Sequence, residues 1–124
     1  MRLSKLSIAT AALLGALAVI SGALGAHALE KVLTPEQLDS YETAVRFQMY
    51  HALAILALGA LSYGPKIKGL ATVYWLWVVG TVLFSGSIYL LVLSPIKVGI
   101  VTPIGGVVLI AGWIALFVWA LRRA

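Results

Sequence analysis

The stretch that decides the fold runs from Ala44 to Tyr63 and reads AVRFQMYHALAILALGALSY. It is about as long as one membrane span, since a helix needs roughly 20 mostly apolar residues to cross a hydrocarbon core of about 30 Å. Three polar residues, Arg46, Gln48 and His51, lie near its beginning. Charged and titratable side chains are costly inside hydrocarbon and usually face protein or water. The stretch therefore predicts both a membrane-spanning helix and a candidate site.

The composition of the whole chain indicates an integral membrane protein. Its 124 residues are 62% hydrophobic and 10% charged, and its mean hydropathy is +1.06. These values lie outside the usual range of soluble domains. We expect an all-α fold: one transmembrane domain over residues 1–124, a four-helix bundle with helices at about 6–29, 35–63, 69–93 and 103–121.

The charged residues are segregated by side of the membrane. The net charge of +5 could suggest nucleic acid in a soluble chain. With the N-terminus in the cytoplasm, however, the inner side receives Arg2, Lys5, Lys66, Lys68, Arg122 and Arg123. The outer side receives Lys31, Arg46, Lys97 and all four acidic residues, which satisfies the positive-inside rule. Both termini are therefore predicted to be cytoplasmic, and no nucleic-acid partner is expected.

The first apolar run admits two interpretations. It follows a basic start, and Ala26-His27-Ala28 has the small-x-small form of a signal-peptidase site. The run is about 20 residues long, whereas the apolar region of a signal peptide usually has about 7 to 15. This length favours an uncleaved first helix over a cleaved signal. Within it, Ala18, Gly22 and Ala26 form a small-xxx-small stripe that predicts packing against another helix.

Capping patterns predict where two of the helices begin. In Thr34-Pro35-Glu36-Gln37, Thr34 can cap, the proline suits the first helical position, and Gln37 completes a capping box. Thr102 and Pro103 repeat the pattern and predict the start of the last helix. The sequence Tyr63-Gly64-Pro65-Lys66 predicts a tight inner turn.

Polar residues from all four predicted helices converge in the outer half of the bundle. On helical spacing Glu42 could pair with Arg46, while Arg46 and His51 differ by roughly 140° around the axis and need not share a target. Arg46 could also reach the membrane surface, and the serines and the tyrosine could serve only as interhelical hydrogen-bond partners. The candidate ligand-binding residues are His27, Arg46, Gln48, His51, Ser85, Ser87, Tyr89 and Thr102.

Few residue patterns point to catalysis. The absence of cysteine excludes disulfides, thiolate metal ligands and thiol redox chemistry. No nucleophile motif, phosphate loop or nucleotide fingerprint is present, and the two histidines lack a third metal ligand of clear spacing. We expect no catalytic residue, cofactor or metal. Enzymatic activity would need a cofactor that the sequence does not indicate.

Several strings resemble a known family of small membrane proteins. They are Gly25 to Leu29 (GAHAL), Thr43 to Leu53 (TAVRFQMYHAL), Phe84 to Tyr89 (FSGSIY), Thr102 to Gly106 (TPIGG) and Gly112-Trp113. Together they resemble the DUF423 family, the UPF0382 group of bacterial proteins, which is similar also to eukaryotic transmembrane protein 256. The resemblance implies a four-helix protein of the bacterial inner (plasma) membrane with an uncleaved first helix, and no assigned biochemical activity.

Three hypotheses of function follow. In the first, the protein binds a lipid head group or other amphipathic ligand in an outer-leaflet polar pocket. Arg46 is the anion partner, and membrane lipids are the ligands. The second is a small transporter or channel, proton-linked through His51. The third is a structural or assembly subunit, in which the polar cluster holds the bundle together and a second copy or a partner membrane protein packs on it.

Overall fold

The computed structural model describes residues 2–64 and 67–123. The chain forms α1 (Leu3–Ala26), the short 3-10 helix η1 (Leu29–Lys31), α2 (Pro35–Leu61), α3 (Ala71–Leu93) and α4 (Val101–Arg122). All four α-helices are long and apolar enough to cross a membrane, and the described residues contain no strand. The predicted all-α membrane bundle is confirmed. Residues 65–66 of the predicted inner turn lie outside the described residues.

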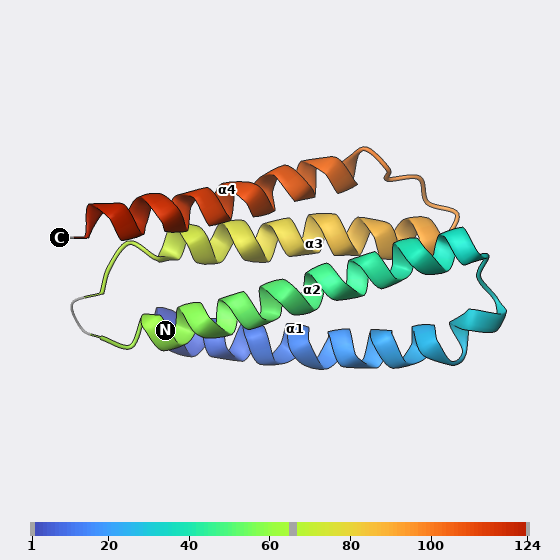
Figure 1. Ribbon diagram of the computed structural model, residues 1–124, viewed down its shortest axis with the longest axis horizontal. Coiled ribbons are helices and arrows are strands. Elements are labelled where there is room, and N and C mark those ends of the chain that lie inside the picture. The colour runs from blue at the N-terminus through green and yellow to red at the C-terminus, as the bar shows by residue number, and fades with distance from the viewer. Residues whose placement is uncertain (1, 65–66, 124) are drawn as a thin grey trace.

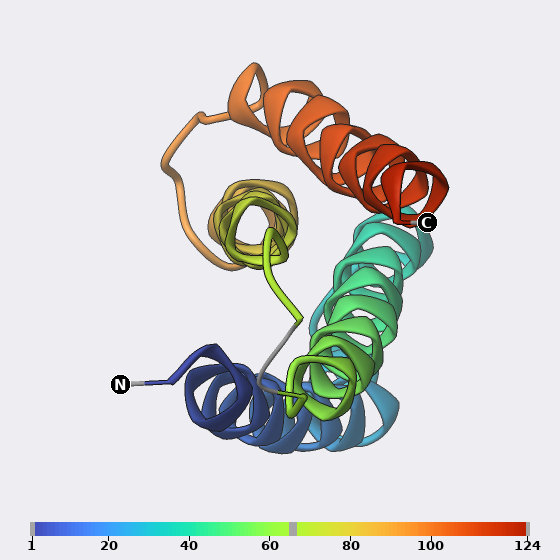
Figure 2. The same ribbon diagram turned by 90° about the vertical axis from the view of Figure 1, so that its left-hand side faces the viewer.

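The helices run up and down, and both ends of the chain lie at the same end of the bundle (Figure 1). Viewed along the helices, α1 and α4 lie on opposite sides of the molecule, with α2 and α3 between them (Figure 2). The most extensive interfaces are α1 with α2 and α3 with α4, followed by α2 with α3. The bundle is therefore two helical hairpins that meet along α2 and α3, and these two helices are more buried than the outer pair.

The first hairpin packs through a seam of small residues on α1. The buried residues of this helix are Ser4, Ser7, Ala11, Ala18 and Gly25, which recur at three-, four- and seven-residue steps. Such a 3.5-residue period is typical of helices that cross at about 20°. Small side chains let the backbones approach closely, which favours association in lipid. The predicted stripe of Ala18, Gly22 and Ala26 is therefore only partly right, because Ala26 is exposed.

Glycines on α4 let this helix pack closely against α3 in the second hairpin. A Cβ at Gly112 would collide with the Trp77 ring, and a Cβ at Gly105 would collide with the backbone nitrogen of Phe84. On α3, Gly80 is packed in the same way against Leu109. These contacts show that α3 and α4 touch at backbone distance, with little room for larger side chains.

The helix ends agree with one of the two capping predictions. Thr34 caps α2, and the capping box with Gln37 is complete. The predicted start at Thr102-Pro103 is wrong, because α4 begins at Val101. The proline is tolerated there, since the first N–H groups of a helix have no intrahelical partner. The Thr102 hydroxyl hydrogen-bonds Ser87 instead of capping.

Other helix boundaries also differ from the prediction by a few residues. Helix α1 begins at Leu3 and ends at Ala26, because Ser4 and Ser7 are buried against the bundle and His27 already leaves the helical conformation. Helix α2 ends at Leu61 rather than 63. Helix α3 begins at Ala71 rather than 69, after Gly69, whose φ of +90° is outside the helical range.

Candidate functional site

The structure divides the eight predicted site residues into two sets. His27 follows the last residue of α1, and both His27 and Arg46 are exposed. The other six are buried or half-buried between helices: Gln48, His51, Ser85, Ser87, Tyr89 and Thr102. Arg46 and His27 therefore do not share a pocket with the buried set.

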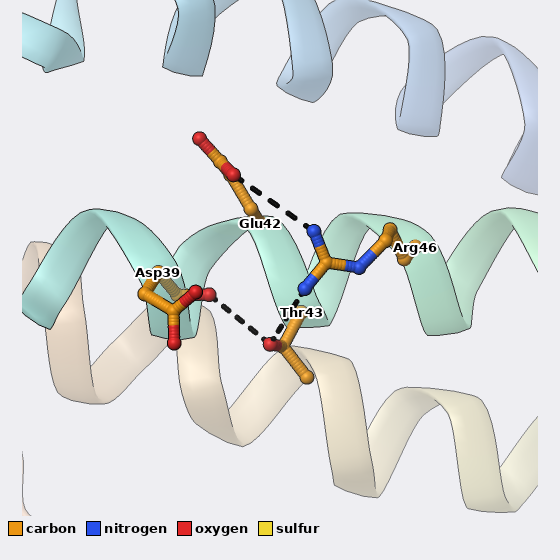
Figure 3. A network of polar contacts seen from close by, with 4 residues as sticks. All are labelled: Asp39, Glu42, Thr43 and Arg46. Carbon is orange, nitrogen blue, oxygen red and sulfur yellow. Dashed lines mark hydrogen bonds and ion pairs between the residues drawn. The ribbon is translucent and has the colours of Figure 1, made fainter.

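Arg46 is engaged by its own helix. Its guanidinium lies 3.8 Å from the Glu42 carboxylate, with about half of each side chain exposed, and it donates to the Thr43 hydroxyl at 3.2 Å. The Thr43 hydroxyl in turn donates to the Asp39 carbonyl oxygen, so all four residues form one network along α2 (Figure 3). The predicted pairing of Glu42 with Arg46 is confirmed.

Gln48 joins three helices at one point. Its Nε2 donates to the Leu14 carbonyl of α1 at 2.8 Å, and its Oε1 accepts from the Tyr89 hydroxyl of α3 at 2.7 Å. Gln48 lies at the midpoint of α2, which runs for 27 residues from Pro35 to Leu61. Gln48 therefore connects α2 to both of the helices that pack beside it at this point.

The buried serines also form interhelical or local hydrogen bonds. Ser85 of α3 donates to the Ala44 carbonyl of α2 at 2.7 Å. Ser87 bonds the Thr102 hydroxyl of α4 as well as its own helix at Phe84. In lipid, such bonds between side chains and neighbouring helices contribute about 0.6 kcal/mol each on average. These residues help to hold the helices in register.

His51 has a partner on each ring nitrogen. Nδ1 donates to the Phe47 carbonyl at 2.8 Å, and Nε2 accepts from the Trp113 indole N–H at 3.1 Å. A carbonyl only accepts and an indole N–H only donates, so the two partners define the neutral tautomer with the proton on Nδ1. Within residues 2–64 and 67–123, no three His, Asp or Glu side chains come together as a metal site would require.

A groove of about 330 Å³ opens on the bundle surface between α1 and α3, with α2 beneath it. It brings together three of the predicted residues, Gln48, Ser85 and Tyr89. The remaining lining is apolar or small and carries no charge: Leu14, Leu17, Ser21, Thr81, Val82 and Gly86. This neutral groove, which we call the α1–α3 groove, is the candidate site.

Thr81 is the residue of the groove that the sequence reasoning missed. It is 2% exposed, and its hydroxyl has no hydrogen-bond partner among the described residues. A buried hydroxyl without a partner costs roughly 1 to 3 kcal/mol. Spacing could have revealed it, because Thr81, Ser85 and Tyr89 follow one another at four-residue steps and share one face of α3.

Four apolar spans, paired as hairpins and linked by buried polar contacts, define a small multi-pass membrane protein. Residues 21–106 match the family described as "Protein of unknown function (DUF423)". The chain belongs to this family, as its sequence resemblance implied. No solved structure matches it.

Relatives in several bacteria match over nearly the whole chain. A UPF0382 membrane protein of Staphylococcus aureus is 45% identical, and the match covers 97% of this chain and 98% of that protein. The UPF0382 membrane protein YwdK of Bacillus subtilis is 39% identical, and the match covers 95% of this chain and 98% of that protein. The UPF0382 inner membrane protein YgdD of Escherichia coli is 40% identical, and the match covers 96% of this chain and 92% of that protein. The expected location in the bacterial inner membrane is confirmed.

Proposed function

We propose that this protein binds an amphipathic molecule in the α1–α3 groove and holds an uncharged polar group of that molecule between the membrane-spanning helices. The observation that carries the proposal is the buried, unpartnered hydroxyl of Thr81 beside the groove. The hydroxyl is covered in this structure, so a carbonyl or hydroxyl group of a bound molecule would become its partner once the side chains over it shift.

The lining of the groove supports an uncharged polar group. Gln48 has one amide hydrogen and one oxygen lone pair beyond its two bonds, and Ser85 and Tyr89 retain lone pairs after donating. The groove thus offers both donors and acceptors but no charge. A charged group in this groove would lack a partner, since Arg46 does not line the groove and is paired with Glu42. The bound group is therefore neutral, in contrast to the anion expected from Arg46.

The shape of the groove supports an apolar body on the bound molecule. Leu14, Leu17 and Val82 form much of the lining, and the volume of about 330 Å³ is near the lower end of small-molecule pockets, roughly 300 to 1,000 Å³. A short polar group with one attached chain fits this space, and the rest of the chain would lie along the lipid-facing surface.

A blocking substitution tests the site. Gly86 lines the groove, and a Cβ added there meets nothing within 4 Å, so Gly86→Leu should fill the groove without forcing the helices apart. Gly15→Leu is the matched control, because Gly15 also has free space and does not line the groove. Mass spectrometry of lipids retained by detergent-purified protein should show a specific lipid lost from Gly86→Leu and kept by Gly15→Leu.

Thr81→Val separates loss of ligand from loss of fold. The substitution removes an unpartnered hydroxyl at nearly constant shape, so delipidated protein should unfold at the same temperature or higher. Retention of the specific lipid should nevertheless fall roughly tenfold, which corresponds to one lost hydrogen bond of about 1.4 kcal/mol. Arg46→Ala should leave retention unchanged. Unaltered retention in both Gly86→Leu and Thr81→Val would contradict the proposal.

A further inference from the structure

A second groove lies at the opposite end of the bundle, near the two chain termini, between the start of α3 and the end of α4. It has a volume of about 520 Å³ and is lined by three cationic residues, Lys68, Arg122 and Arg123, together with Trp119 and Thr72. No Asp or Glu side chain lines it. All four acidic residues of the chain lie between positions 30 and 42, at the other end.

The fold fixes two of the groove residues around Trp119. The Trp119 indole N–H donates to the Lys68 carbonyl oxygen at 2.7 Å, which holds the segment before α3 against the last turns of α4. The Arg123 guanidinium lies 4.9 Å from the centre of the Trp119 ring, within the range of a cation–π contact. Trp119 therefore positions the backbone of Lys68 and the guanidinium of Arg123 at one edge of the groove.

The electrostatics of this groove favour an anion. Like charges gathered in one groove repel one another, and an anion between them removes that repulsion. Helix α3 begins at Ala71, so the positive end of its dipole and its first free N–H groups lie at the groove. The arginines add planar guanidinium groups, which match the oxygens of a phosphate.

An apolar groove adjoins the basic one. It shares Thr72 with it, has a volume of about 520 Å³, and continues along α3 and α4 with Trp75, Leu76, Val79 and Val108 in its lining. A phosphate held by the cationic residues would thus have a channel beside it for an acyl chain. Tryptophan at both positions, Trp75 and Trp119, is typical of the level of lipid head groups.

We infer that this pair of grooves binds an anionic phospholipid, with the phosphate in the basic groove and an acyl chain in the apolar groove. Basic pockets between transmembrane helices are suited to anionic lipid head groups. The site is separate from the α1–α3 groove in both position and charge, so it does not depend on the function proposed above.

The test measures binding of two lipids by native mass spectrometry of the detergent-purified protein. Phosphatidylglycerol and phosphatidylcholine with the same acyl chains are titrated separately. The wild-type protein should bind phosphatidylglycerol about tenfold more tightly than phosphatidylcholine. In Arg122→Gln/Arg123→Gln this preference should disappear, because binding of phosphatidylglycerol should fall more than binding of phosphatidylcholine.

Two further variants make the result specific to these grooves. Lys5→Gln/Lys31→Gln removes the same amount of charge from residues outside both grooves and should keep the preference. Trp119→Phe keeps an aromatic ring but removes the N–H donor to Lys68, and should weaken phosphatidylglycerol binding by a factor of about three to ten. Thermal unfolding in phosphatidylcholine alone should show that all variants are folded.

Three outcomes would overturn the inference. Equal binding of the two lipids by the wild-type protein would show that the net negative charge of the head group is not recognised. An equal loss in the Lys5→Gln/Lys31→Gln control would show diffuse attraction by net charge. Competition by millimolar inorganic phosphate, with no effect of acyl-chain length, would show a site for free phosphate rather than for a phospholipid.

Discussion

The Trp113 indole N–H of α4 donates to Nε2 of His51 on α2, at 3.1 Å. This bond joins the first hairpin to the second, and it requires an unprotonated Nε2. The imidazole also lies near the Trp77 ring, at a centroid distance of 6.2 Å. A proton on Nε2 would remove the acceptor for Trp113. His51 in this structure is therefore an interhelical acceptor, and the predicted proton-linked role would require this bond to break.

A double-mutant cycle on His51 and Trp113 measures this bond. His51→Phe and Trp113→Phe each remove one partner, and the double variant removes both. We expect a coupling energy of about 1 kcal/mol, within the range measured for hydrogen bonds between membrane helices. The free energy of unfolding, measured by reversible denaturation in detergent micelles, provides the four values. Strict additivity of the two single effects would contradict the bond.

Gly105 and Gly106 should respond differently to the same substitution. A Cβ at Gly105 would collide with the α3 backbone at Phe84, whereas a Cβ at Gly106 would lie 3.7 Å from the Phe84 ring, an ordinary contact. Gly105→Ala should therefore destabilise the protein by about 1 to 3 kcal/mol. Gly106→Ala should be neutral or stabilise it by up to about 1 kcal/mol, because alanine favours the helix. Thermal unfolding of both variants in one detergent tests the difference.

Arg46→Ala should have little effect on stability. The Arg46 and Glu42 side chains are about half exposed and 3.8 Å apart, and pairs of this kind contribute roughly 0.3 to 0.5 kcal/mol. Unfolding in detergent should show a change no larger than this. A loss above about 1 kcal/mol would mean that Arg46 supports the bundle, as expected if the polar residues had only a structural role.

Thr34→Ala should destabilise the start of α2. The substitution removes the side-chain acceptor for the Gln37 N–H and disrupts the capping box, at a cost of about 1 kcal/mol. Thr34→Ser keeps the acceptor and should lie close to wild type. Amide hydrogen exchange should show faster exchange in the first turn of α2 for the alanine variant only. Equal exchange in the two variants would rule out the cap as a source of stability.

The spans could be predicted from sequence because hydropathy over about 20 residues reports membrane helices directly. The environment of each polar residue could not be predicted in this way. Arg46 and Gln48 are adjacent in the pattern, yet two residues rotate a helix by about 200°, so one is exposed and the other lies between three helices. Both faces of α2 are apolar, and the sequence does not show which one meets protein.

The seam on α1 shows a similar limit. Small residues occur on several faces of this helix, so a four-residue step through Ala18, Gly22 and Ala26 was as visible as the seven-residue step through Ala11, Ala18 and Gly25. Only the position of Tyr41, whose ring packs on Gly25 and whose hydroxyl bonds the Ser21 carbonyl, distinguishes the two. The residues of α2 that pack on α1 therefore determine which of the two spacings of small residues lies in the interface.

The division into two hairpins has a consequence for biosynthesis. The contacts between α1 and α2 lie within residues 3–61, so they can form while the rest of the chain is still being synthesised. The α1–α3 groove, in contrast, takes residues from both hairpins and exists only once the second has docked on the first. A molecule bound there would stabilise the fully assembled protein over half-inserted chains, and its supply could set how much newly made protein escapes degradation.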